Sequence, residues 1–147
     1  MIIQHKFTPD LNLMGKRITL IAQGTRRAGL INVVSEVEAR AIKYAPVRTS
    51  NLANSGTSDV NADGTIGVVK FTARYAGYVH KGTGLYGPHK TKIVPKNKKA
   101  LYWPGAAHPV RAVKGMHGNP FLTRAAEESD IRKLFIEGAE NYLRRRG

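Results

Sequence analysis

The sequence predicts a single α+β domain over residues 1–147, with a long N-terminal helix, a small antiparallel sheet of about four strands and a C-terminal helix. Three observations support this fold class. Apolar residues recur every three or four positions between residues 11 and 44, as on one face of a helix. The middle of the chain contains short strand-like runs separated by turn residues. A second helical pattern follows Asn119-Pro120 and continues to the end of the chain.

The first helix is expected to begin at Thr8-Pro9-Asp10, because a hydroxyl cap, a proline and an acid in the first turn favour a helix start. Pro46 ends it. An unbroken helix would be a rod of roughly 50 Å. A break between Gly24 and Gly29 is the alternative, since each glycine destabilises a helix by about 1 kcal/mol. The apolar stripe is longer than a small domain can cover, so part of it is expected to face another subunit. It consists of Leu11, Met14, Ile18, Ile21, Thr25, Ala28, Ile31, Val34, Val37, Ala41 and Tyr44.

The first two strands are expected at residues 57–60 and 65–73, on either side of the turn Asn61-Ala62-Asp63-Gly64. In the second strand, Val69 and Phe71 share one face, and the intervening lysine points to the other face. The result would be a half-buried antiparallel hairpin.

A second pair of strands is expected at residues 98–103 and 109–113. Between the two hairpins, residues 74–83 predict one short helical turn that ends at Gly82. Residues 84–98 contain glycines, prolines and lysines without any periodicity, so we expect an exposed basic loop that is mobile when the protein is alone.

The last helix is expected to start at Asn119-Pro120, with the asparagine as its cap and the proline in its first position. Its basic end, residues 144–146, complements the helix dipole. The buried side is expected to comprise Leu122, Ala125, Ser129, Leu134, Ala139 and Tyr142.

The net charge of +14 is concentrated in the centre of the chain. Residues 64–126 contain eleven Lys and Arg residues and no Asp or Glu, whereas residues 1–63 carry eight basic and five acidic residues and residues 127–147 carry five of each. Such a segment favours an anionic partner, which can be nucleic acid, an acidic protein surface or a membrane. No apolar run is long enough to span a bilayer, and the first seven residues lack the order of a signal peptide. We therefore expect a soluble protein that is made inside the cell and has no membrane partner.

The sequence contains no pattern that indicates an enzyme. It has no cysteine, which excludes thiolate metal sites and thiol nucleophiles. His80, His89, His108 and His117 are not paired at helical spacing and have no nearby carboxylate, so surface or hydrogen-bonded histidines are favoured over a metal site. The ten acids occupy the two helical ends and the first turn rather than a catalytic pair, and no nucleophile elbow is present. We expect no catalytic, metal-binding or cofactor-binding residues.

The basic loop is the strongest functional signal. Lysines at five positions fall within ten residues, and they are Lys90, Lys92, Lys96, Lys98 and Lys99. A solvated loop is the simple alternative. As a nucleic-acid site, the lysines would contact phosphates without reading sequence. The aromatic residues Tyr75, Tyr78, Tyr86, Tyr102 and Trp103 lie in or beside this region, where they can stack on bases or, more commonly, belong to a core or an interface.

Four stretches, in order, resemble a family of small tail-component proteins of long-tailed double-stranded DNA bacteriophages, which join or complete the head–tail junction. Ala45-Pro46-Val47-Arg48-Thr49-Ser50-Asn51-Leu52 resembles the family's A-P-x-x-T-G-x-L, with Ser50 in place of the glycine. Tyr75-Ala76-Gly77-Tyr78-Val79-His80-Lys81-Gly82-Thr83 is similar to Y-A-x-x-V-E-x-G-T, with His80 in place of the acid. The others are Val94-Pro95-Lys96-Asn97-Lys98-Lys99-Ala100-Leu101 and Asn119-Pro120-Phe121-Leu122-Thr123-Arg124-Ala125, the latter close to P-F-L-x-x-A.

This resemblance implies a structural virion protein of the phage neck or tail-completion region, made in the host bacterial cytoplasm. It implies a homo-oligomeric ring, with six subunits expected, stacked between the head connector and the tail tube or tail terminator. The acid-free surface would meet an acidic neighbouring ring or the double-stranded DNA that passes through. The family supplies no catalytic residues. Candidate packing or subunit-interface residues are Tyr75, Tyr78, His80, Phe121 and Leu122, of which we expect Tyr75, Tyr78 and Phe121 to pack between the hairpin and a helix.

Two functional hypotheses therefore follow. The first is a structural head–tail joining protein in which the basic loop is an inter-ring contact. The second is a stand-alone module that binds nucleic acid through Lys90 to Lys99 without sequence preference.

Overall fold

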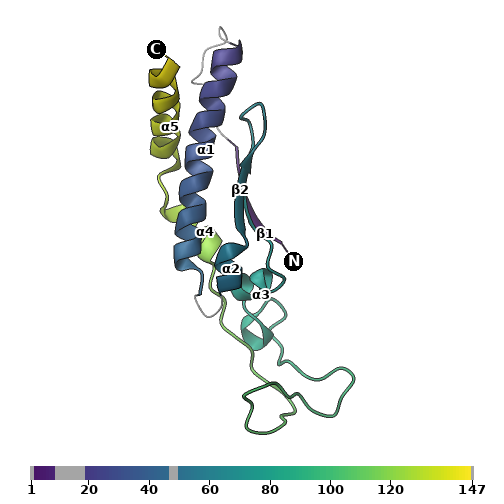
Figure 1. The fold of residues 1–147 in the computed structure, drawn as a ribbon. Helices are drawn as coiled ribbons and strands as arrows, with labels where there is room; N and C mark the ends of the chain where they lie inside the picture. Colours follow the sequence, from purple (N-terminus) through teal and green to yellow (C-terminus); the bar gives the residue numbers. More distant parts are fainter. Residues whose placement is uncertain (1, 9–18, 47–49, 147) are drawn as a thin grey trace.

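A computed structural model describes residues 2–8, 19–46 and 50–146, with side chains described from residue 21 onward in the first helix. A three-stranded antiparallel sheet packs against one side of a long helix, α1 (Thr19–Tyr44). A second long helix, α5 (Ile131–Arg146), packs along α1. A loop-rich arm projects from the end of the molecule that lies away from the C-terminus (Figure 1). The α+β prediction is confirmed, although the sheet has three strands and not four.

Helix α1 runs without a break through Gly24 and Gly29, so the alternative of a broken helix is wrong for the described residues. Both glycines lie where α5 approaches most closely. A Cβ at Gly24 would overlap the ring of Tyr142, and one at Gly29 would lie 2.8 Å from the ring of Phe135. The two glycines therefore allow close helix packing, which offsets their low helix propensity. The predicted start of this helix, over residues 9–18, lies outside the described residues.

The apolar stripe of α1 is confirmed at Thr25, Val34, Val37 and Ala41, which are buried, but it is displaced at other positions. Ile21 and Ile31 are exposed, whereas Leu30 and Val33 are fully buried. The displacement arises because α1 contacts two layers, the sheet on one side and α5 on another, so its buried surface is wider than a single stripe.

The predicted hairpin is confirmed as strands β2 (Gly56–Val60) and β3 (Gly67–Phe71). The Asn61 side chain accepts hydrogen bonds from the backbone N–H groups of Thr65 and Ile66, at 2.9 and 3.0 Å, which fixes the turn. Gly64 has a positive φ of 68° and lies against the backbone of Arg27 in α1. The turn is therefore closed both by its own asparagine and by contact with the helix.

The sequence analysis missed strand β1 (Ile3–Phe7), which pairs antiparallel with β3 and places β3 at the centre of the sheet. Ile3, His5 and Phe7 alternate with more exposed residues, which is the period-two pattern of a half-buried strand. That pattern was present in the sequence but spans only five residues.

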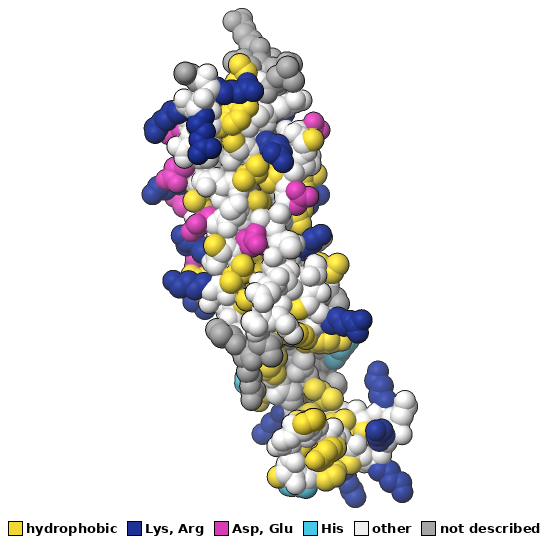
Figure 2. Space-filling model, viewed as in Figure 1, with side chains coloured by type: hydrophobic (Ala, Val, Ile, Leu, Met, Phe, Trp, Pro, Cys, Tyr) yellow, Lys and Arg dark blue, Asp and Glu magenta, His cyan; other side chains and the backbone are white. Residues whose placement is uncertain are grey.

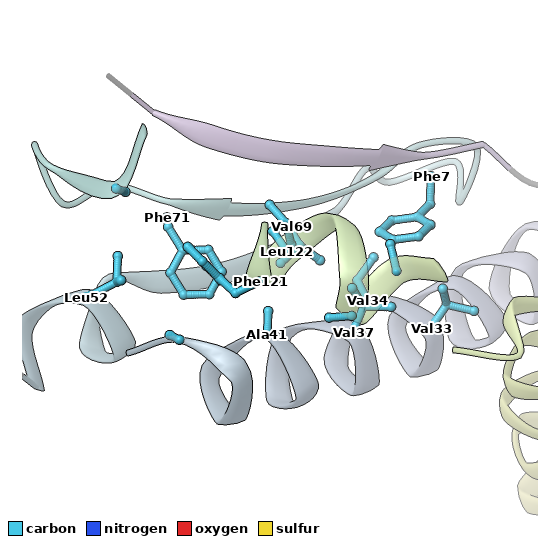
Figure 3. Close-up of a cluster of buried hydrophobic side chains, with 14 of the residues drawn as sticks. Phe7, Val33, Val34, Val37, Ala41, Leu52, Val69, Phe71, Phe121 and Leu122 are labelled. Carbon is cyan, nitrogen blue, oxygen red and sulfur yellow. The ribbon is translucent and has the colours of Figure 1, made fainter. Parts of the chain in front are cut away.

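The core lies between the sheet, α1 and a short helix, α4 (Phe121–Glu128) (Figure 3). Phe71 of β3 and Phe121 of α4 meet edge to face, with ring centroids 4.9 Å apart. Both rings are fully buried, and Leu52 of helix α2 (Ser50–Asn54) closes the same end of the core.

The C-terminal helix is two helices and not one. Between α4 and α5, Ser129 has extended backbone, and the Asp130 carboxylate accepts the N–H of Lys133 at 3.1 Å, as an N-cap does. The predicted buried side is confirmed at Leu122, Ala125, Ser129 and Ala139, whereas Leu134 and Tyr142 are only partly buried. The break between the two helices is therefore produced by a local Ser-Asp capping signal.

The prediction that Asn119 caps the last helix is wrong. Helix α4 begins at Phe121 after Pro120, and no side chain caps it. The Asn119 amide instead donates a hydrogen bond to the backbone carbonyl of Tyr44 at the end of α1, over 3.1 Å. Asn119 is thus used for a contact between distant parts of the chain.

Replacing Phe121 with Ala is expected to lower the free energy of unfolding by about 3–5 kcal/mol, because the ring is completely buried against Phe71. Tyr78→Ala is the matched control, since Tyr78 is 56% exposed, and should change stability by less than about 1 kcal/mol. Urea denaturation followed by circular dichroism measures both. A loss below about 1 kcal/mol for Phe121→Ala would contradict the core packing.

Candidate assembly interface

The principal candidate site is the arm, which we define as residues 83–118. It leaves the body after helix α3 (Ala76–Lys81), passes through the short 3-10 helix η1 (Gly84–Tyr86) and returns immediately before α4 (Figure 1). No residue between 88 and 118 is buried. The arm therefore has no hydrophobic core of its own.

The second strand pair predicted from the sequence does not form as a ladder. Two isolated antiparallel bridges join the halves of the arm, Ile93 to Val113 and Leu101 to Val110. Seven residues lie between Ile93 and Leu101 on the outgoing segment, but only two lie between Val110 and Val113 on the returning segment. Residues 94–100 must therefore bulge outward, and regular strands cannot form. The pairing across the Pro104-Gly105 turn is correct, but the regular strands are not.

The base of the arm, residues 83–86 and 114–117, is held together mainly by backbone contacts, and we call it the neck. The N–H of Thr83 donates to the carbonyl of Met116 at 2.9 Å, and the N–H of Leu85 donates to that of Lys114 at 2.7 Å. The Met116 N–H donates to the Thr83 hydroxyl at 2.9 Å. The ring of Tyr86 stacks on that of His117 with centroids 3.6 Å apart. The two chain segments of the neck are thus locked together before the arm extends.

Glycines make this close crossing possible. Gly82, Gly84 and Gly115 have positive φ angles of 86°, 62° and 98°. A Cβ at Gly115 would overlap the carbonyl of Thr83, and a Cβ at Gly84 would overlap the carbonyl of Lys114. Both the backbone conformation and the space exclude a side chain at these positions.

The root of the arm, where Asn119 follows the return segment, joins two of the four stretches that resemble the family, residues 75–83 and 119–125, and bonds to Tyr44, the residue before a third. Besides its bond to Tyr44, Asn119 donates its backbone N–H to the carbonyl of Val79 in α3, over 2.8 Å. His80 lies 3.1 Å from the Thr123 hydroxyl and edge to face with Phe121. Three segments that are far apart in the sequence therefore meet at the point where the arm begins.

The arm carries charge of one sign only. It contains seven Lys and Arg residues and no Asp or Glu, so it contributes +7 of the net +14. Among the described residues, the ion pairs all lie in helices of the body, at Arg40–Glu36, Arg124–Glu128 and Arg144–Glu140. The lower protrusion in Figure 2 accordingly shows Lys and Arg side chains and exposed apolar ones without acidic ones. Within the part of the chain that the structure describes, no acid forms an ion pair with the arm.

The arm also exposes aromatic side chains. Tyr102 is 67% exposed and Trp103 is 46% exposed, and Ile93, Val94 and Met116 are exposed as well. Of the fifteen large hydrophobic residues that are exposed in the described parts of the chain, nine lie from Tyr75 to Met116. Exposed aromatics beside unpaired cations are typical of surfaces that contact another macromolecule.

The structure places the five predicted lysines, Lys90 to Lys99, on the exposed arm, three of them on the bulge of residues 94–100. The arm is longer than the predicted basic loop of residues 84–98 and includes the return segment with Arg111 and Lys114. The sequence analysis missed the neck glycines as functional positions. Their spacing was visible, but the contact between the two neck segments was not.

The predicted packing residues divide into two groups. Phe121 and Leu122 are fully buried in the core, and His80 is partly buried at the root. The packing prediction is wrong for Tyr78, whose side chain is exposed, and Tyr75 is more than one-third exposed. Tyr75 borders an open hollow of about 420 Å³ lined mainly by polar residues, including Arg74 and Asn51. A role of Tyr75 and Tyr78 in a subunit interface stays a prediction.

No three His, Asp or Glu side chains of the described residues are grouped so that they could hold a metal ion. None of the described helices is long and apolar enough to cross a membrane. The sequence matches no protein-family model, and comparison with the curated proteins and with the solved structures finds no match either.

The His80 contacts at the root predict a pH dependence of stability. Burial lowers the pKa of His80 below its ordinary 6.5, with a smaller contribution from Lys81, and burial lowers the pKa of His5 as well. As the pH falls through 6.5, the unfolded chain binds protons that the folded chain resists, so the free energy of unfolding should decrease.

Urea denaturation at about pH 7.5 and pH 5.5 measures this effect. His80→Gln should show a smaller loss of stability on acidification than the wild type, and a double variant with His5→Gln a smaller loss still. If His80→Gln keeps the full pH dependence, the assignment is wrong.

The neck predicts different consequences for two glycines. Gly115→Ala is expected to release the neck, because a methyl group would overlap the Thr83 carbonyl. Gly105→Ala is the matched control: Gly105 also has a positive φ, of 94°, but nothing lies within 4 Å of its Cβ position. Hydrogen exchange at the amides of Thr83, Leu85 and Met116 should accelerate in Gly115→Ala and stay unchanged in Gly105→Ala. Equal exchange in both variants would contradict the locked neck.

Proposed function

We propose that this chain is a structural protein of the phage head–tail interface, a neck or tail-completion subunit that assembles into a ring and uses its arm to contact a neighbouring component. The observation that supports this proposal is the arm itself, which is held rigidly at its neck yet buries none of its residues from 88 to 118. A rigidly held segment without a core of its own is suited to complete its packing against a partner.

The family resemblance supports the same function. Its stretches at residues 75–83 and 119–125 meet at the root of the arm, the stretch at residues 45–52 directly follows Tyr44, to which Asn119 bonds, and the stretch at residues 94–101 lies on the arm. The resemblance is thus carried mainly by residues that hold and form the arm. In a ring, the arm of each subunit would reach the layer above or below.

Phage particles produced without this chain test the proposal. We expect filled heads and separate tails in electron micrographs, because the joint between them would be missing. Heads joined to tails of normal length would contradict the proposal.

The contribution of the arm is tested by replacing residues 88–113 with a short Gly-Ser linker, which retains the neck. Because the arm contributes no buried residue to the body, we expect this variant to fold and to give the circular dichroism spectrum of the body. Particles that carry the variant should nevertheless fail to join heads to tails. Normal joining by a folded variant would show that the arm is not the contact.

A further inference from the structure

The partner of the arm is constrained by the charge of the rest of the molecule. Outside the arm the chain carries 17 of the 24 basic residues and all 10 acidic ones, so the body is also at +7. Two copies that approach arm to body would repel each other. The net charges therefore favour an anion other than this chain as the partner of the arm.

The uniform sign of the arm distinguishes between the possible anions. Most protein surfaces interleave both signs of charge, and where a positive patch binds a protein it is matched by a negative patch of limited size. Seven cations without an acid match a partner whose charge is equally uniform. A line of phosphates has this property, and lysine is suited to phosphates because it acts as a point charge without a fixed geometry.

The shape and the apolar groups of the arm support the same partner. Two isolated bridges join the halves of the arm, and the bulge of residues 94–100 between them presents Lys96, Lys98 and Lys99 at the surface. Lys98 and Lys99 are close in sequence to Tyr102 and Trp103, whose rings are exposed. Aromatic rings beside cations provide surfaces on which bases can stack.

We infer that the arm binds the phosphate backbone of nucleic acid, without sequence preference, through Lys90, Lys92, Lys96, Lys98 and Lys99, with Trp103 at the contact. This inference rests on the proposed function only in naming the partner of the arm. Within a neck ring, the ligand would be the phage DNA that passes through. A single-stranded and a double-stranded nucleic acid share this chemistry, and the experiment includes both.

Trp103 is the single tryptophan of the chain and lies on the arm, so its fluorescence reports the contact directly. The purified full chain is titrated with a duplex of about 20 base pairs and with a single strand of the same length. We expect quenching or a spectral shift with at least one of them. With five phosphates contacted, duplex affinity should fall roughly 500-fold between about 50 and 200 mM salt.

Two matched variants locate the binding site. Replacing the five arm lysines with Ser should abolish binding. In the control variant, five exposed lysines of the body are replaced with Ser, which removes the same charge. Its affinity for nucleic acid should stay within about twofold of the wild-type value, because only the long-range attraction by the net charge is reduced. These lysines are Lys6, Lys43, Lys70, Lys81 and Lys133. Equal losses in the two variants would overturn the assignment to the arm.

A titration with polyglutamate of the same total charge as the nucleic acid tests whether the arm prefers phosphate or carboxylate groups. If it shifts the Trp103 signal as strongly as nucleic acid does, the partner is an acidic protein surface and the inference is wrong. The inference is also wrong if neither nucleic acid binds. Failure in this titration, together with unjoined particles for the arm replacement, would leave the proposed function standing. Binding here, together with joined particles in the absence of the chain, would overturn only the proposed function.

Discussion

The structure depends on one junction, where Asn119 ties together three segments that are distant in the sequence. Its side chain bonds to the last turn of α1 and its backbone N–H to α3, while the next residues enter α4. Each such bond contributes about 1 kcal/mol on its own. Together they matter more for the orientation of the arm than for the stability of the fold, because they fix the direction in which both neck segments leave the body.

The body is built so that this junction has a firm support. Gly24 and Gly29 of α1 and Gly138 of α5 remove side chains from the interface between the two long helices, and a Cβ at any of them would lie within 2.8 Å of the partner helix or overlap it. The core on the other side of α1 is equally tight, with Phe71 and Phe121 in edge-to-face contact. Asn119 is thus anchored to elements that are themselves closely packed, which limits movement at the root.

Local signals made the main elements predictable, and contacts between distant residues explain the errors. The period of Val34, Val37 and Ala41 and the turn at Asn61 are local, and both predictions are confirmed. The position of Asn119 before a proline resembled a helix cap, but the partner of its amide lies 75 residues away. Similarly, Gly24 and Gly29 are unfavourable in an isolated helix, and only the position of α5 shows why they occur there.

For the candidate site, too, local features could be predicted from the sequence and contacts between distant residues could not. The charge of the arm and its lysines could be read from composition, because charge needs no partner to be counted. The way the base of the arm is held could not, since it depends on the backbone hydrogen bonds of Thr83 and Leu85 across the neck. This difference changes the physical role of the lysines. On a mobile loop their ordering would oppose binding by about 1–2 kcal/mol for each backbone residue fixed. Where the neck already orients the arm, part of that conformational entropy is lost when the chain folds. Binding of a partner by the unpaired charges then costs less conformational entropy.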